Sequence, residues 1–219
     1  MNDKNIKFPP VCFVTGIGTD VGKSYATAWL ALEIMKSGES VITQKFIQTG
    51  CHEWSEDIQT HRRLMGIEPT PDDLLHITAP IIFSYPASPH LAAKLDNREL
   101  DLNLATESTR ILKGSHDHVL IEGAGGIMVA LHGNFLTIDY IRQQQLPVIV
   151  VTTGQLGSIN TTLLTLRAID DWGLSLFALV YNPHFDKDEI ICSDTRNYLK
   201  GWMEEHYPDS FYLEMPEKF

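Results

Sequence analysis

Several features that would assign this sequence to a common class are scarce or missing. Its three cysteines, Cys12, Cys51 and Cys192, show neither a disulfide framework nor metal-site spacing, which predicts a reducing compartment, the cytoplasm. No apolar run reaches the roughly 20 residues of a membrane span, and the first ten residues lack the apolar core of a signal peptide. Basic residues are also few. The 17 Lys and Arg against 28 Asp and Glu give a net charge of −11, which argues against nucleic acid or a membrane as a partner.

What is present is an alternation of short apolar runs and helical periods over 219 residues, of which 43% are hydrophobic. Because strands that alternate with helices form parallel sheets with right-handed crossovers, we predict one α/β domain over residues 1–219, with a flexible N-terminus at 1–10. The expected architecture has three layers, a mostly parallel sheet with helices on both faces. The first strand is predicted to begin at residue 11, and further strands are predicted at 41–46, 118–122, 146–153, 176–181 and 211–215. Helices are predicted at 22–36, 57–65, 103–113 and 186–205, and another one follows the turn at 154–160 and ends at about residue 172. Residues 66–82 are predicted to form a loop.

The glycine-rich stretch from Val11 to Ser24 is the most informative part of the sequence. A buried-strand pattern leads to Gly16-Ile17-Gly18-Thr19-Asp20-Val21-Gly22-Lys23-Ser24, and a helical period follows. Glycines let backbone N–H groups turn toward phosphate oxygens, and the helix points its positive end at the same place. Lys23 is expected to reach the β- and γ-phosphates, and the Ser24 hydroxyl to hold Mg²⁺. The two outer glycines are separated by five residues instead of four, so we predict a variant phosphate loop in a P-loop NTPase-like fold.

Further polar residues stand where predicted strands end. Lys45 lies near the end of the second strand, and Glu122 ends a buried strand that continues into Gly123-Ala124-Gly125-Gly126. In P-loop enzymes a carboxylate at such a strand end binds Mg²⁺, directly or through water. Since ligands bind at the C-terminal ends of parallel strands, we expect these residues, the turn at Gly154 and Asn182 to share one crevice with the phosphate loop.

Two segments have both a structural and a ligand-binding interpretation. The acidic pair Glu56-Asp57 begins a predicted helix, where an acid is commonly a cap but is also suited to a metal. The Gly154–Asn160 turn leads into another helix N-terminus, which is either an anion site or an ordinary strand-to-helix connection.

Five segments together resemble the dethiobiotin synthetase family, in the same order along residues 11 to 216. They are the variant loop Gly16–Ser24, the Lys-x-x-x-Thr-Gly segment Lys45–Gly50, the turn Ser88-Pro89-His90, the run Glu122–Gly126 and the segment Leu156–Asn160. Two positions depart from the family pattern, since Asp20 stands in place of Glu and Phe46 in place of Pro.

The resemblance implies roles for individual residues. Lys45 and Lys23 are the implied catalytic residues. The implied ATP-binding residues are Thr19, Asp20, Val21, Gly22, Lys23, Ser24, Tyr25, Asp57, Glu122, Gly123, Ala124, Gly125, Asn182, Pro183 and Pro216. The implied Mg²⁺ ligands are Ser24, Asp57 and Glu122, with Glu56 open as an alternative to Asp57 because the stretch after Lys45 is short. The implied substrate-binding residues are Thr49, Ser88, Gly157, Ser158, Ile159 and Asn160.

The activity implied by the resemblance is an ATP-dependent ligation in biotin biosynthesis. CO₂ joins 7,8-diaminopelargonate, and a carbamate and a carbamic–phosphoric anhydride lead to the ureido ring. The family also implies a homodimer in which the site for the substrate carboxylate is shared across the interface. Two alternatives are a related P-loop amidoligase, similar to cobyrinate synthase, and a partitioning-type ATPase switch. The switch is disfavoured because residues 16–19 lack its additional lysine and because the chain is acidic.

Overall fold

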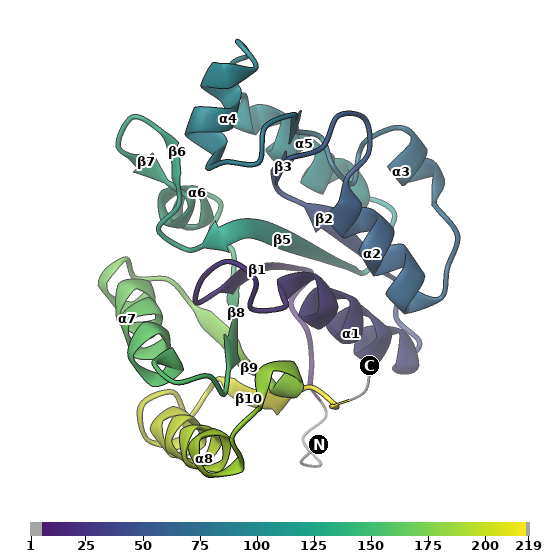
Figure 1. The fold of residues 1–219 in the computed structure, drawn as a ribbon. Coiled ribbons are helices and arrows are strands. Elements are labelled where there is room, and N and C mark those ends of the chain that lie inside the picture. The colour runs from purple at the N-terminus through teal and green to yellow at the C-terminus, as the bar shows by residue number, and fades with distance from the viewer. Residues whose placement is uncertain (1–5, 218–219) are drawn as a thin grey trace.

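The computed structural model of the protein describes residues 6–217 and shows a six-stranded parallel sheet at its centre (Figure 1). The strand order is β10-β9-β8-β1-β5-β2, and each neighbouring pair is parallel. The strands are β1 (Val11–Gly16), β2 (Val41–Lys45), β5 (His118–Gly126), β8 (Val148–Thr153), β9 (Leu176–Asn182) and β10 (Phe211–Glu214). The chain passes from β1 to one side of the sheet and later returns to its other side, so the strand order reverses at β1. In open α/β sheets the crevice at such a reversal is where ligands bind.

Helices cover both faces of this sheet, as the sequence predicts (Figure 1). Side chains of α1 and α2 join one hydrophobic cluster, and side chains of α4 to α8 join the other. The helices are α1 (Lys23–Lys36), α2 (Glu56–Met65), α3 (Pro71–Leu74), α4 (Pro89–Leu95), α5 (Leu102–Lys113), α6 (Thr137–Gln143), α7 (Ser158–Asp171) and α8 (Glu189–His206), with a 3₁₀ turn, η1 (Pro183–Phe185).

The two clusters follow from the alternation of side chains along each strand. In β1, Cys12 and Val14 pack on the α1 side, whereas Phe13 belongs to the opposite cluster. Successive strand residues point to opposite faces, so a strand that is apolar at every position is buried on both. The continuous apolar runs in the sequence are therefore the physical reason for a sheet with helices on both sides.

The structure corrects the expected elements in several places. The predicted loop at 66–82 contains α3, which begins after Thr70 with a reciprocal cap between Thr70 and Asp73. The predicted helix at 186–205 begins later, because the Asp188 side chain caps α8 at Ile190 and Ile191. Several short elements were not predicted. They are the strands β3 (Gln48–Thr49), β4 (Ile82–Phe83), β6 (Ala130–His132) and β7 (Phe135–Leu136), which form two-stranded pairs, and the helices α4 and α6.

Three further expectations concern the chain ends, the cysteines and the membrane. Of the expected flexible segment 1–10, residues 1–5 lie outside the described residues, while Phe8 is buried and packs against Phe177 with ring centroids 5.3 Å apart. The cysteines are free and buried. Between residues 6 and 217, no helix is sufficiently long and apolar to span a bilayer.

Candidate active site

The phosphate loop connects β1 to α1 and depends on glycine at two positions. Gly22 precedes the helix in a left-handed conformation, with φ of 84°, and a Cβ there would lie 2.2 Å from Asn182 Nδ2. A Cβ on Gly16 would lie 2.5 Å from a methyl group of Val21. A side chain at position 16 would therefore clash with Val21 of the same loop, which is a physical reason for the glycine at this shifted position. The Lys23 amine is folded into the loop, where it donates to the Gly18 carbonyl at 2.8 Å.

Four side chains from four elements meet beside the loop. Ser24 Oγ of α1 lies 2.9 Å from Asp57 Oδ1 of α2 and 3.0 Å from Glu122 Oε1 of β5. The Lys45 amine, at the end of β2, lies 2.5 Å from Asp57 Oδ2 and 2.8 Å from Glu122 Oε1. The structure therefore brings Asp57 to Ser24, while Glu56 is exposed on the first turn of α2. Ser55 caps this helix through Ile58 N, which sets the direction in which Asp57 points.

Burial and charge act against each other in this cluster. Burial lowers the pKa of Lys23 to about 8, with repulsion from Lys45 in the same direction and Glu122 opposing it. Burial would also lower the pKa of Lys45, but Glu122 and Asp57 outweigh it and raise that pKa. Burial disfavours the Glu122 carboxylate, yet Lys45 and a hydrogen bond from His61 hold the pKa of Glu122 well below its usual range. Glu122 is thus a buried anion that depends on its neighbours.

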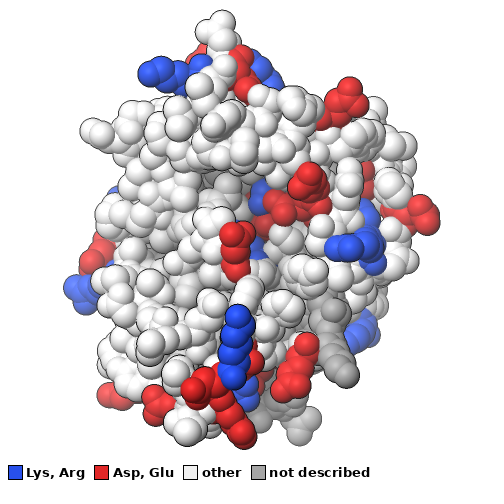
Figure 2. Space-filling model, viewed as in Figure 1, with Lys and Arg blue, Asp and Glu red and all other residues white. Residues whose placement is uncertain are grey.

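A cavity of about 1170 Å³ extends over this cluster and across the C-terminal ends of the strands. Figure 2 shows acidic and basic side chains gathered in a recess near the middle of this face. Most of the residues predicted from the sequence line the cavity, namely Thr19, Asp20, Gly22, Lys23, Ser24, Tyr25, Lys45, Thr49, Asp57, Ser88, Glu122, Ala124, Gly125, Asn182 and Pro216. The sequence prediction of one crevice is therefore correct for the ends of β1, β2, β5 and β9.

The Gly154 turn does not share this crevice, contrary to expectation. A Cβ on Gly154 would lie 2.1 Å from the Tyr181 hydroxyl and 2.3 Å from Asp186, so the turn packs against β9 and the segment after η1. The segment Gly157–Asn160 also lies outside the cavity lining. Its Ser158 is 4% exposed, and the Ser158 hydroxyl has no hydrogen-bond partner among the described residues.

Three other residues predicted to bind ATP do not line the cavity, namely Val21, Gly123 and Pro183. The Val21 carbonyl accepts a hydrogen bond from Asn182 Nδ2 at 3.0 Å, and the Gly123 carbonyl accepts one from Lys45 at 3.2 Å. Pro183 is buried within η1. Asn182 itself is 3% exposed, and its Oδ1 accepts from His184 N at 3.1 Å. Asn182 therefore lines the cavity, and the hydrogen bond from its side-chain amide also connects the phosphate loop to the end of β9.

Some residues of the cavity were not predicted from the sequence. Gln48 is buried, and its Oε1 accepts a hydrogen bond from Ser55 Oγ at 2.6 Å. His184 lies nearly parallel to Tyr25, with ring centroids 6.4 Å apart and an angle of 14° between the planes. Gln48 stands next to Thr49 in a segment already singled out, which is a usable signal. His184 directly follows Asn182 and Pro183, which the sequence analysis already assigned to the nucleotide site, so its place in the chain is a usable signal as well.

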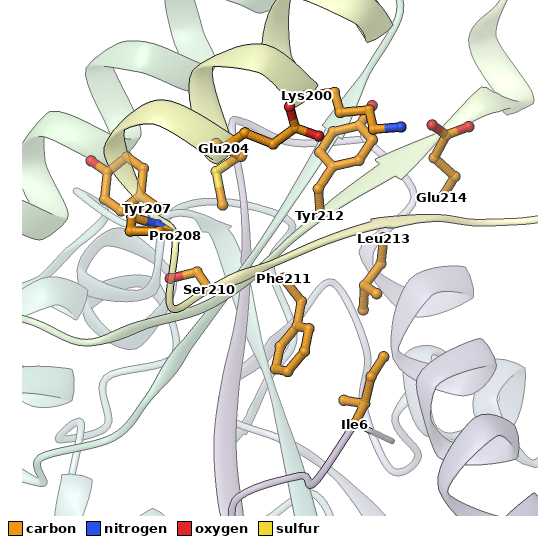
Figure 3. A pocket seen from close by; sticks show the side chains of 11 residues that line it. Ile6, Lys200, Glu204, Tyr207, Pro208, Ser210, Phe211, Tyr212, Leu213 and Glu214 are labelled. Carbon is orange, nitrogen blue, oxygen red and sulfur yellow. The ribbon is translucent and has the colours of Figure 1, made fainter. Parts of the chain in front are cut away.

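A second cavity, of about 530 Å³, lies at the edge of the sheet beside β10 and α8. Figure 3 shows Phe211, Leu213 and Ile6 on one side of the β10 ribbon and Tyr212, Lys200 and Glu204 on the other. The hollow therefore follows both sides of an edge strand. None of the residues predicted to bind ATP, Mg²⁺ or substrate lines it.

Comparison with known proteins extends these observations. Residues 11–200 match the family model described as an AAA domain. The chain is 46% identical over 205 residues to an ATP-dependent dethiobiotin synthetase BioD 2 from Pasteurella multocida, covering 94% of this chain and 96% of that protein. It is 42% identical over 196 residues to an ATP-dependent dethiobiotin synthetase BioD from Chlorobaculum tepidum, covering 90% and 82% of the two chains.

Solved structures show a similar fold at low sequence identity. A plasmid partition protein from Borrelia burgdorferi superposes with a TM-score of 0.55 at 15% identity, covering 97% of this chain and 91% of that one. The chloroplast FtsY of Physcomitrella patens superposes with a TM-score of 0.52 at 16% identity, covering 93% of this chain and 57% of that one. The three-layer P-loop architecture is therefore shared with proteins of quite different sequence.

Proposed function

We propose that this chain, which belongs to the ATP-dependent dethiobiotin synthetase family, uses ATP to carboxylate 7,8-diaminopelargonate and to close the ureido ring of dethiobiotin. The observation that carries the proposal is the meeting of Lys23, Lys45, Ser24, Asp57 and Glu122 on one cavity at the C-terminal edge of the sheet. Two lysines beside a phosphate loop are suited to a reaction in which negative charge accumulates on a transferring phosphoryl group.

The reaction begins when one amine of the substrate adds CO₂ and loses a proton, which gives a carbamate anion. A carbamate oxygen then attacks the γ-phosphorus of ATP and releases ADP, and the product is a carbamic–phosphoric anhydride. The second amine attacks the carbonyl carbon and expels phosphate, which closes the ring. Lys23 and Lys45 stabilise the charge on the phosphoryl oxygens, and the cavity orients the two reactants.

The residues beside the loop fit Mg²⁺ as the metal. Ser24, Asp57 and Glu122 offer oxygen atoms, which this hard cation prefers, and the two carboxylates require the countercharge that Lys45 supplies in part. Among the described residues, no group of three or more His, Cys, Asp and Glu side chains could hold a metal alone. These three residues would therefore hold Mg²⁺ together with ATP phosphates and water, and the ion would neutralise phosphate charge.

The proposal assigns the diamine to Thr49 and Ser88, and it is supported by the fact that both residues line the cavity. Ser88 is the N-cap residue directly before α4, and its hydroxyl makes no capping hydrogen bond, so it is available to a ligand. The carboxylate of the substrate is assigned to Gly157–Asn160 of a second subunit. Support for this assignment comes from the buried Ser158 hydroxyl, which has no hydrogen-bond partner within residues 6–217 and lies at the N-terminus of α7, where an anion is favoured. The proposed active form is thus a homodimer.

The first test is the ATP-dependent incorporation of labelled bicarbonate into an acid-stable product, with 7,8-diaminopelargonate and Mg²⁺ present. Lys45→Met keeps the length of the side chain and removes its charge, and we expect it to lower the rate by about 10²- to 10³-fold. Lys36→Met is the matched control, because Lys36 is an exposed residue of α1 that pairs with Glu33 on the same helix. Failure of the unaltered protein to form acid-stable label while it binds ATP would overturn the proposed function.

A further inference from the structure

A chain of buried polar side chains extends from Glu122 away from the cavity. His61 Nε2 lies 2.6 Å from Glu122 Oε2, and His61 Nδ1 lies 3.0 Å from Thr43 Oγ1. Arg62 donates to Thr43 Oγ1 at 2.7 Å and to both oxygens of Asp73 at 2.8 Å. His61 and Thr43 are 0% exposed, and neither lines the cavity. Glu122 was predicted as a site residue from the sequence, but His61, Thr43, Arg62 and Asp73 were not.

The hydrogen-bond capacities of these groups assign the direction of each bond. Arg62 can only donate, so Thr43 Oγ1 accepts its hydrogen bond. An ionised Glu122 carboxylate can only accept, so the ring proton of a neutral His61 lies on Nε2 and is donated to Glu122 Oε2. Nδ1 of that ring carries no proton, and it accepts the hydroxyl proton of Thr43. Arg62, Thr43 and His61 therefore form a relay of donors that ends at one oxygen of the Glu122 carboxylate.

Stability alone gives little reason for this arrangement. Replacing a buried ion pair and its polar neighbours by apolar side chains of similar volume is often neutral or stabilising. The two oxygens of Glu122, however, have separate surroundings. Oε2 is held by His61, whereas Oε1 faces Ser24 and Lys45. The terminal torsion of a glutamate side chain is broad, so without His61 the carboxylate could rotate and exchange its two oxygens.

We propose that His61 is a positioning residue, which holds Glu122 Oε2 so that Oε1 is presented to the metal beside Ser24. The inference rests on the proposed function only in taking Glu122 as a carboxylate of the Mg²⁺ site. Partners in the outer shell of a metal site typically change metal affinity by about 10- to 100-fold when they are removed. Thr43 and Arg62 act one step further out, because they hold the ring of His61.

The test is the affinity for Mn²⁺, a spectroscopic substitute for Mg²⁺, in the presence of a non-hydrolysable ATP analogue. Free Mn²⁺ is followed by electron paramagnetic resonance. We expect His61→Leu to weaken Mn²⁺ affinity by about 10- to 100-fold and His61→Gln, whose amide can donate to Glu122, to recover part of the loss. His118→Leu is the matched control, since His118 is a buried histidine at the other end of β5, bonded to the Pro9 carbonyl. We expect it to leave Mn²⁺ affinity unchanged.

Urea unfolding of each variant, and nucleotide affinity without metal, separate positioning from a general loss of structure. If His61→Leu does not fold, Thr43→Val removes only the hydroxyl in a side chain of similar shape and is expected to weaken Mn²⁺ binding severalfold. A folded His61→Leu protein with Mn²⁺ affinity within about twofold of the unaltered protein would overturn the inference. Because the titration needs no diamine, His61-dependent Mn²⁺ binding in a protein that fixes no bicarbonate would support this inference and contradict only the proposed activity.

Discussion

Two glycines of this protein share a backbone conformation but differ in their surroundings. Gly22 in the phosphate loop has φ of 84°, and Gly38 after α1 has φ of 86°. A Cβ on Gly22 would lie 2.2 Å from Asn182 Nδ2, whereas a Cβ on Gly38 would have no heavy atom of the described part of the chain within 4 Å. The left-handed conformation costs an alanine about 1 kcal/mol at either position. Only at Gly22 must neighbouring atoms also move.

We therefore expect Gly22→Ala to weaken the affinity for ATP by at least about tenfold, which corresponds to roughly 1.4 kcal/mol of binding free energy. Gly38→Ala is expected to lower the free energy of unfolding by about 1 kcal/mol and to leave ATP affinity unchanged. Isothermal titration calorimetry and urea unfolding of both variants give these values. Equal ATP affinity of the two variants would show that the contact with Asn182 does not shape the loop.

At the scale of secondary-structure elements, one ion pair connects α2, α3 and β2. Arg62 of α2 donates to Asp73 of α3 and also to the carbonyl of Thr43 in β2. Asp73 accepts further bonds from Thr78 Oγ1 at 2.6 Å and from Thr70 N at 2.7 Å. Burial alone would raise the pKa of Asp73, but the hydrogen bonds from Arg62 and Thr78 outweigh it and lower that pKa to about 2.

This lowered pKa predicts a specific acid sensitivity. Because the folded protein binds a proton at Asp73 near pH 2 and an ordinary aspartate does so at 3.8, the unfolded state binds more protons between these values. Asp73 by itself should therefore lower the free energy of unfolding by about 2 kcal/mol as the pH decreases from about 4 to about 2.

Urea unfolding over this pH range measures the effect. Asp73→Asn should reduce stability at neutral pH, since Arg62 loses its partner, and should also remove this part of the pH dependence. Asp72→Asn, on the neighbouring residue of α3, is the control and should keep the full slope. An unchanged slope in Asp73→Asn would mean that another carboxylate is responsible.

At the scale of the whole molecule, the proposed dimer requires the N-terminus of α7 to contribute to the site of a partner subunit. Gly157–Asn160 lies outside the cavity of its own chain, so it can serve the substrate only if it reaches the site of a partner. Two large apolar side chains next to it are exposed, Leu156 by 87% and Leu164 by 63%. Single exposed leucines are ordinary, but these two flank the segment that the proposal assigns to the interface.

We expect Leu164→Glu to convert a dimer into monomers and to raise the KM for the diamine, because a charge would be buried at the interface. Analytical ultracentrifugation and steady-state kinetics measure the two effects. Leu75→Glu, at an exposed leucine next to α3, is the control and should leave both unchanged. An unaltered protein that is active and monomeric at the assay concentration would contradict the shared site.

Some properties of this protein are determined by residues close together in the chain. The strand, glycine turn and helix around Gly16–Ser24, and the apolar strand that ends in Glu122, are local patterns. They were predicted because backbone conformation depends mainly on neighbouring residues. The order of alternating strands and helices, and with it the parallel sheet covered on both faces, follows from the same patterns.

Other properties were decided only by the tertiary structure. The choice of Asp57 over Glu56 depends on how the Ser55 cap orients α2 over β2. Glu122 meets His61 across 61 positions of sequence, and Asn182 meets Val21 across 161. Such contacts form only when the strands have assembled into the sheet, and the spacing of residues along the chain does not specify the order of the strands. The sequence by itself thus determined which chemical groups the site has, and the packing of β1, β2, β5 and β9 decided which of them touch.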